Sequence, residues 1–127
     1  MRLVLTRDSV AAGDDIDAPH ERALADIPPV ATLDGLERLI RQVVGGNYLA
    51  SVAGRATWAA FSNLPLAVYS NLAEQPRMIW LTDRDVTDRL NVRDGTLRMH
   101  FVYLAMVDPD TAFDVLRSIR SAWQESD

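Results

Sequence analysis

The chain has 127 residues, 48% of them hydrophobic, no cysteine and a formal net charge of −5 at pH 7. This length suits one domain with a substantial core, and the lack of cysteine excludes disulfide frameworks, zinc–thiolate sites and thiol catalysis. An acidic protein repels phosphate backbones, so nucleic-acid binding is disfavoured as a primary role. No apolar run approaches the roughly 18 to 20 residues that cross a bilayer, and a chain without disulfides fits a reducing cytosol. We therefore expect a cytoplasmic protein that contacts neither nucleic acid nor membrane.

The first third of the chain predicts two strands and one helix. Residues 2–6 form a short branched-apolar run that predicts a strand, and the polar residues 8–19 predict a loop. Residues 20–27 alternate weakly and predict a second strand, which a Pro-Pro pair ends. A helix is expected over residues 33–44, capped by Thr32. Its apolar positions fall on one face at helical spacing: Leu33, Leu36, Leu39, Ile40 and Val43.

The middle of the chain predicts several strands separated by turn residues. The strand-like segments are 48–53, 55–61, 64–70 and 76–82. Their spacing favours an antiparallel meander. The polar residues 83–90 predict one or two helical turns, and Asp94-Gly95 is a strong turn signal.

Residues 96–107 are apolar on both alternating sets, which is typical of a central strand covered on each side. Asp108 at the N-cap and Pro109 at the first helical position predict a final helix. Its apolar stripe consists of Phe113, Leu116, Ile119 and Trp123. The whole chain, 1–127, is therefore expected to be one α+β domain, with two helices packed on an antiparallel or mixed sheet of about five to seven strands.

Residues 13–21, GDDIDAPHE, are the densest polar stretch. The acids in this stretch are Asp14, Asp15, Asp17 and Glu21, with His20 among them. Three interpretations stay open: a metal site, a solvated loop in which Asp and Gly form turns, and a contact surface for a basic protein. The spacing breaks the calcium-binding EF-hand pattern after two ligands, and HExxH is absent. No metal or cofactor is expected.

Catalytic signatures are missing from the sequence. There is no GxSxG elbow, no phosphate-binding loop and no cysteine nucleophile. His100 lies within an apolar strand, so we expect a hydrogen-bonded core or sheet-surface histidine that points with Val102 and Leu104, away from a wet active site. We therefore expect a protein that is not an enzyme.

Two further features could contribute to a contact surface. Trp80 is the candidate for an exposed aromatic anchor, because it stands next to the charged residues 83–89. That segment holds Asp83, Asp85 and Asp88, which form a second acidic patch in this interpretation.

The chain resembles the small, acidic, cysteine-free immunity proteins that neutralise bacterial polymorphic or contact-dependent growth inhibition toxins. The stretches that carry the resemblance are LTRDSVAAGDDIDAPHE and YLASVAGRATW, together with size, charge and the expected compact α+β fold. The resemblance implies stoichiometric binding of a cognate toxin domain, such as a nuclease, whose active site the immunity protein covers.

Two alternatives remain beside this expectation. One is a small metal-dependent or acid–base enzyme that uses His20 with Asp14, Asp15 and Asp17. The other is a structural or adaptor protein that associates with further copies of itself through an exposed apolar face.

Overall fold

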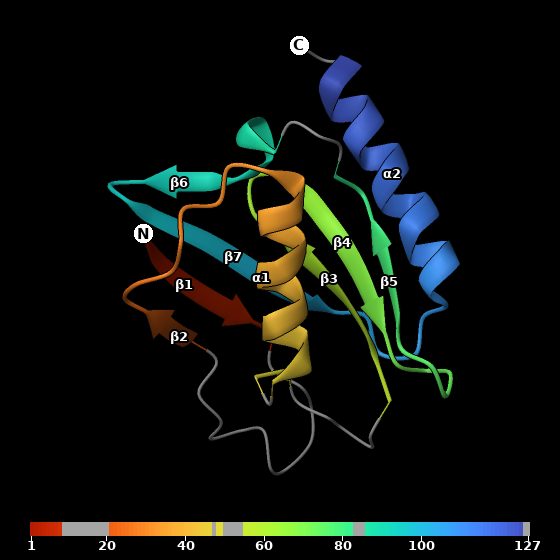
Figure 1. Ribbon diagram of the computed structural model, residues 1–127. Coiled ribbons are helices and arrows are strands. Elements are labelled where there is room, and N and C mark those ends of the chain that lie inside the picture. Colours follow the sequence, from red (N-terminus) through yellow and green to blue (C-terminus); the bar gives the residue numbers. More distant parts are fainter. Residues whose placement is uncertain (9–20, 47, 50–54, 83–85, 126–127) are drawn as a thin grey trace.

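The computed structural model describes residues 1–8, 21–46, 48–49, 55–82 and 86–125. Within these residues the chain forms helices α1 (Leu33–Gly45) and α2 (Pro109–Glu125), a 3₁₀ helix η3 (Thr87–Arg89) and a seven-stranded sheet. The strands are β1 (Arg2–Arg7), β2 (Glu21–Leu24), β3 (Thr57–Phe61), β4 (Pro65–Ser70), β5 (Arg77–Trp80), β6 (Asn91–Arg93) and β7 (Thr96–Tyr103). Figure 1 shows α1 lying across the sheet and α2 beside β4 and β5.

The sheet is mixed, and its strands do not follow sequence order. The order is β2-β1-β7-β3-β4-β5, with β6 also paired to β7. β1 and β7 run parallel, whereas the other pairs are antiparallel. The predicted α+β fold, with two helices on a mixed sheet of five to seven strands, is therefore confirmed. Three of the four strands predicted for the antiparallel meander are confirmed, because β3, β4 and β5 are consecutive antiparallel neighbours.

β7 is a central strand of the sheet, as predicted from the apolar residues that occupy both of its alternating faces. β1 pairs with one of its edges, while β3 and β6 share the other. The prediction that this strand continues to residue 107 was wrong, because β7 ends at Tyr103. The next residue, Leu104, donates its N–H to the carbonyl of Thr57, and Ala105 then adopts a φ of 52°, which turns the chain out of the sheet.

Helix α1 covers one face of the sheet. Its buried side chains are Leu36, Leu39, Ile40 and Val43, four of the five apolar positions expected on its inner face. They pack in one cluster with Leu3, Leu97 and Phe101 from β1 and β7. Thr32 caps the helix as predicted, since its hydroxyl accepts a hydrogen bond from the N–H of Gly35 at 3.1 Å.

Replacing Thr32 with alanine is expected to lower the free energy of unfolding by about 1 kcal/mol, because the substitution removes the acceptor for a backbone N–H in the first turn. Urea titration monitored by circular dichroism measures the change. Thr32→Ser keeps the hydroxyl and should retain most of the stability. Equal losses in the two variants would contradict a capping role.

Helix α2 packs on the opposite face. Asp108 caps it as predicted: its Oδ2 accepts from the N–H of Thr111 at 3.1 Å. Ala112 and Leu116 are buried in a second cluster, in which they meet three buried residues of the sheet region: Ala59, Val68 and Leu81. A bidentate ion pair between Arg77 and Asp110, with distances of 3.0 and 3.1 Å, joins α2 to β5. Hydrogen bonding by Arg77 lowers the pKa of Asp110.

Among the described residues, packing on the α2 face is seen over β3, β4 and β5. The remaining half of this face is formed by β2, β1, β6 and the first residues of β7, which lie away from α2 in Figure 1. Strand alternation places Arg2, Val4, Thr6, Arg98 and His100 on this half, because Leu3, Leu5, Leu97 and Met99 point to the α1 side. Val4 is 5% exposed, whereas the other four are exposed or half-buried. We call this the uncovered half, because no described helix packs on it.

Two predicted elements differ from the structure, and a third, the one or two helical turns expected over 83–90, agrees with it where that segment is described. The strand expected over 20–27 spans only Glu21–Leu24, and His20 lies outside the described residues. Of the strand expected over 48–53, residues 50–53 lie outside the described residues. Tyr48 is in no strand, and its carbonyl accepts a hydrogen bond from Nε of Arg7 at 3.0 Å. The described part of 83–90 forms a single 3₁₀ turn, η3.

Candidate functional site

Most of the acidic residues singled out in the sequence lie outside the described residues. They are Asp14, Asp15, Asp17, Asp83 and Asp85. The structure does describe where their segments join the fold. The first segment joins β1 to β2 at one edge of the sheet, and the second follows β5 at the other edge. The described acids Glu21 and Asp88 are both exposed, Glu21 at the start of β2 and Asp88 in η3. The two acidic stretches are thus attached to the fold at separate places.

Trp80 does not have the exposure expected of an aromatic anchor. It is half-buried in β5, where it pairs with Ala67, and it packs against the core on the α1 side. The guanidinium carbon of Arg41, from α1, lies 5.8 Å from the centre of the indole ring. This cation–π contact occupies one ring face.

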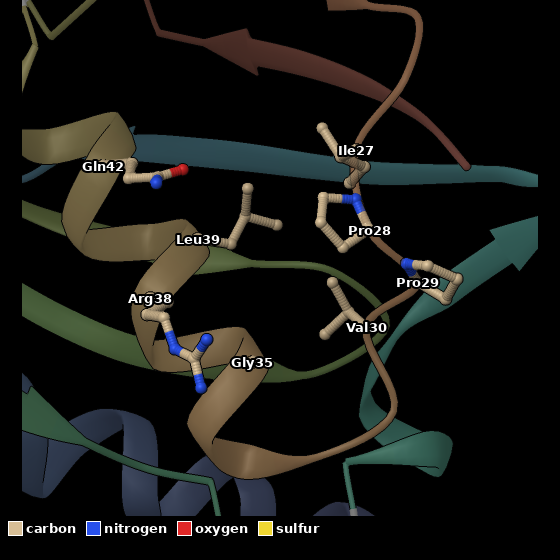
Figure 2. Close-up of a pocket in the computed structure, with 8 residues that line it drawn as sticks. All are labelled: Ile27, Pro28, Pro29, Val30, Gly35, Arg38, Leu39 and Gln42. Atoms are coloured by element: carbon tan, nitrogen blue, oxygen red, sulfur yellow. The ribbon is translucent and has the colours of Figure 1, made fainter.

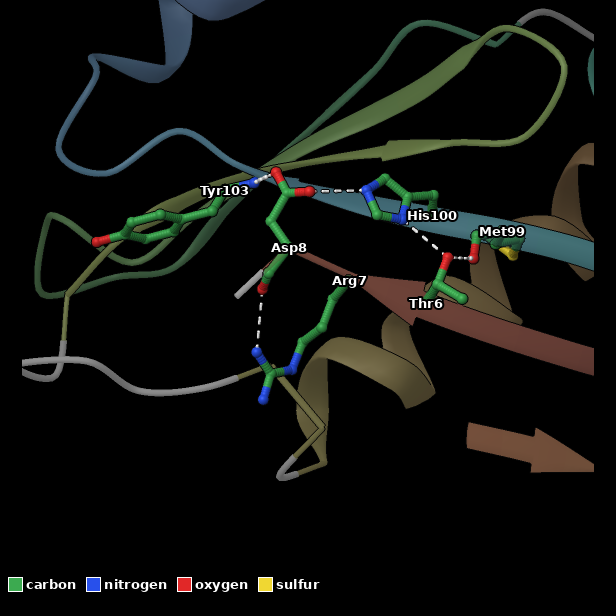
Figure 3. A network of polar contacts seen from close by, with 6 residues as sticks. All are labelled: Thr6, Arg7, Asp8, Met99, His100 and Tyr103. Carbon is green, nitrogen blue, oxygen red and sulfur yellow. Dashed lines mark hydrogen bonds and ion pairs between the residues drawn. The ribbon is translucent and has the colours of Figure 1, made fainter. Parts of the chain in front are cut away.

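A chain of polar contacts lies at the C-terminal ends of β1 and β7 (Figure 3). The Oγ1 of Thr6 is 2.8 Å from Nδ1 of His100, and Nε2 of His100 is 2.9 Å from Oδ1 of Asp8. The other carboxylate oxygen, Oδ2, accepts the N–H of Tyr103 at 2.9 Å. Parallel pairing of Thr6 with His100 brings these residues together. We call Thr6, Asp8 and His100 the β1–β7 clamp.

The clamp can be satisfied with either one or two protons on the imidazole. In the neutral ring that fits these contacts, Nε2–H donates to Asp8 and the Thr6 hydroxyl donates to Nδ1. In the doubly protonated ring, Nδ1–H donates to Thr6 instead. The Thr6 hydroxyl can then turn to the carbonyl of Met99, 3.5 Å away.

His100 was expected to point away from solvent, and that expectation was wrong. Its side chain and that of Asp8 are each 42% exposed. His100 lies on the half of the sheet face that α2 does not cover, which explains its exposure. The expectation of a hydrogen-bonded sheet-surface histidine is confirmed.

Asp8 is also held through its backbone. Its N–H donates to the carbonyl of Phe101 at 3.0 Å, and its carbonyl accepts from Nη1 of Arg7 at 3.1 Å. Arg7 is itself buried and lies 5.8 Å from the ring centre of Tyr48, with Arg22 at 5.1 Å from the same ring. The residue that precedes the first acidic segment is therefore fixed by both its side chain and its main chain.

Burial raises the pKa of Tyr48 to about 12, although the positive charges of Arg7 and Arg22 act in the opposite direction. The folded state thus favours the neutral phenol, and this contribution to stability is present below pH 10 and lost as the pH rises through about 12. Absorbance at 295 nm during alkaline titration should show a tyrosinate signal near that pH, absent in Tyr48→Phe. The chain has three tyrosines, so the Tyr48 signal is the part of the absorbance change that Tyr48→Phe removes. If that part appeared near pH 10 in the folded protein, burial would not be the dominant influence.

The clamp resembles a nucleophile–base–carboxylate arrangement, but its geometry favours a structural role. In Ser-His-Asp hydrolases the carboxylate holds Nδ1 and the nucleophile faces Nε2, and backbone N–H groups form an oxyanion hole. Here the two ring nitrogens have the opposite partners. Thr6 also stands within β1, which pairs with β2 on one edge and β7 on the other, so neighbouring N–H groups serve the ladders.

The structure also contains a small pocket between α1 and the preceding segment (Figure 2). Its volume is about 200 Å³. The lining residues are Ile27, Pro28, Pro29, Val30, Gly35, Arg38, Leu39 and Gln42. Pro28 and Val30 face Leu39 across it. This volume is below the roughly 300 to 1,000 Å³ of typical small-molecule sites, so we assign no ligand to it.

No group of three His, Asp or Glu side chains that could hold a metal ion occurs among the described residues. None of the helices in the described part of the chain has both the length and the apolar character needed to cross a membrane. Comparisons of the chain with protein-family models, with curated proteins and with solved structures gave no match.

Proposed function

We propose that this chain is a non-enzymatic binding protein that neutralises a cognate bacterial toxin by covering the toxin's active site. The observation that carries the proposal is the attachment of the acidic segment 9–20 to the rigid sheet. Asp8, which precedes the segment, is held by the β1–β7 clamp and by two backbone contacts. Glu21, which follows it, is paired with Thr6 on the adjacent strand.

Attachment at both ends favours recognition by this segment. Neighbouring strands lie about 4.8 Å apart, so the two ends of the segment start from neighbouring points on one scaffold. A loop with fixed ends loses less conformational entropy on binding than a free tail. Asp14, Asp15, Asp17 and Glu21 would then form a carboxylate surface on one edge of the fold.

The chemistry of such a surface suits a basic toxin domain, and a nuclease in particular. Nucleases hold phosphates with arginine and lysine side chains, and clustered carboxylates can occupy the same groove. Opposite charges also accelerate association at low ionic strength. In this proposal, Asp83, Asp85 and Asp88 would contribute a second acidic patch that contacts a separate region of the partner.

Co-expression tests the proposal. The chain would be produced together with the C-terminal domain of any large exoprotein encoded immediately upstream, and host survival and co-purification would be measured. Survival with a stable complex is expected. Reversing the charges of Asp14, Asp15 and Asp17 to arginine should abolish both. A matched variant that reverses Asp26, Glu74 and Asp114, three exposed acids elsewhere, should retain both. Host death with the unaltered chain would disprove the proposal.

A further inference from the structure

The uncovered half of the sheet face carries three arginines from three adjacent strands. Arg2 lies on β1, Arg98 on β7 and Arg93 on β6, and all three are exposed. We call Arg2, Arg93 and Arg98 the arginine face. They belong to one face because the register places Arg2 and Arg93 on either side of Thr96, two residues before Arg98.

The spacing of these strands brings the three side chains together. Adjacent strands lie about 4.8 Å apart, and alternate residues of one strand about 6.7 Å apart. The Cα atoms of the arginine face are therefore separated by roughly 8 to 10 Å. Arginine side chains of ordinary length can reach a common ligand from these positions, and each guanidinium offers five N–H donors.

These arginines have no ion pair or side-chain hydrogen bond with any residue in the described part of the chain. Asp94, in the turn between β6 and β7, is the nearest acid in the sequence, and it makes no ion pair with a described arginine. By contrast, other described arginines are engaged: Arg77 pairs with Asp110, and Arg7 binds two backbone carbonyls. In a chain with net charge −5, an unpaired basic cluster on an uncovered face is a feature to be explained.

We propose that the arginine face binds an extended, carboxylate-rich segment of a partner protein. In an extended peptide, alternate side chains lie about 6.7 Å apart on one side, a distance that long arginine side chains from Cα atoms roughly 8 to 10 Å apart can match. Guanidinium groups bind carboxylates in bidentate geometry. Asn91 and Thr96, which lie on the same face, can add hydrogen bonds to the peptide backbone.

Charge complementarity favours this occupant over two others. A nucleic acid would extend past the arginine face over Asp8 and Glu21, at the opposite end of the same sheet half, and the net charge of −5 opposes a polyphosphate. A second copy that docked with equivalent arginines opposite each other would place like charges in contact, which is destabilising. A short acidic segment meets neither obstacle.

This inference goes beyond the proposed toxin binding and uses different residues. It concerns a second surface of opposite charge, so one surface can fail its test without affecting the other. If both hold, the chain can contact an acidic segment and a basic domain at once, on the uncovered face and at the β1–β2 connection respectively.

Titration of the full chain with hexaglutamate, followed by amide chemical shifts in two-dimensional NMR, tests the inference. Binding is expected at low ionic strength, with shifts concentrated on β6, β7 and the start of β1. Arg2→Gln, Arg93→Gln and Arg98→Gln should each weaken binding about two- to fivefold, the range for exposed ion pairs. The triple variant should weaken it at least about tenfold. Arg117→Gln, which removes an exposed arginine on α2, serves as the control and should leave the affinity unchanged.

Two comparison ligands separate the possible occupants. Hexalysine should not bind the arginine face, and a six-nucleotide single strand should bind more weakly than hexaglutamate. No binding of hexaglutamate, or equal binding by the triple variant, would overturn the inference. Tighter binding of the oligonucleotide would overturn it in favour of a general polyanion site. The amide spectrum of each variant reports directly whether the fold is intact.

Discussion

Replacing Leu3 with alanine is expected to lower the free energy of unfolding by about 2–5 kcal/mol, a large part of the roughly 5–15 kcal/mol of a typical domain. Leu3 is 0% exposed and lies in β1 beside Leu97, which is also 0% exposed. The substitution removes apolar contacts from the cluster beneath α1 and leaves a cavity, because the neighbouring strands hold the backbone in place. Unfolding in guanidinium chloride would measure the loss, provided that the dependence of the unfolding free energy on denaturant concentration (the m-value) is the same in both proteins.

Leu24→Ala provides the matched control. Leu24 is the cross-strand partner of Leu3 on β2, with the same side chain on the same face, but it is 43% exposed at the sheet edge. Its replacement should cost less than about 1 kcal/mol. Similar losses at the two positions would show that β1 is not enclosed between β2 and β7.

Replacing Asp8 with alanine is expected to cost about 1–2 kcal/mol, because the N–H of Tyr103 and the imidazole of His100 both lose their acceptor. The value lies below that for a fully buried group, since the Asp8 side chain is 42% exposed and water can partly replace it. Asp8→Asn retains one acceptor oxygen and should lose less. The nitrogen chemical shifts of His100 should change in both variants, because the partner of Nε2 changes.

Asp26→Ala is the control for the clamp, since Asp26 is an exposed acid that makes no side-chain hydrogen bond or ion pair with a described residue. It removes the same charge and should leave both stability and the His100 nitrogen shifts unaltered. A loss of stability at Asp8 without a change in those shifts would contradict the hydrogen bond to Nε2.

The elements with local signals were predictable from sequence. Thr32 and Asp108 cap the two helices. Each has a short side chain with an oxygen acceptor and stands just before a run of apolar residues at helical spacing. The oxygen accepts a hydrogen bond from a free backbone N–H of the first helical turn. The two-sided apolar pattern of residues 96–103 identified the central strand, since both faces of β7 are covered near its C-terminal end. These features depend on residues within a few positions of one another.

The candidate site depended on contacts that no local pattern encodes. Asp8 and His100 are 92 positions apart, and only the parallel register of β1 against β7 brings them within 2.9 Å. The sequence offered two signals: an acid, Asp8, directly after the first apolar run, and a polar residue, His100, inside β7. Neither signal indicates that the two residues are in contact. The arginine face was missed for the same reason, because its members belong to three strands.

β6 was missed for a different reason. It has three residues and two of them are exposed, so it lacks the alternating apolar pattern from which strands are recognised. The Asp94-Gly95 turn was the usable signal, since both residues adopt positive φ, 53° and 70°, as tight hairpins require. A strand on each side of that turn follows from the turn alone.

The parallel pairing of β1 with β7 has a consequence for how the chain folds. Residues 2–7 find their central neighbour only in residues 96–101, so this ladder closes a loop of more than ninety residues. Long loop closure is entropically costly and slows folding in proportion to contact order. During synthesis, α1 and the β3–β4–β5 meander emerge from the ribosome before β7, so β1 gains its β7 partner only after residues 96–101 have been made. Of the seven strands of this sheet, β1 is made before the others and is among the last to gain both of its neighbours.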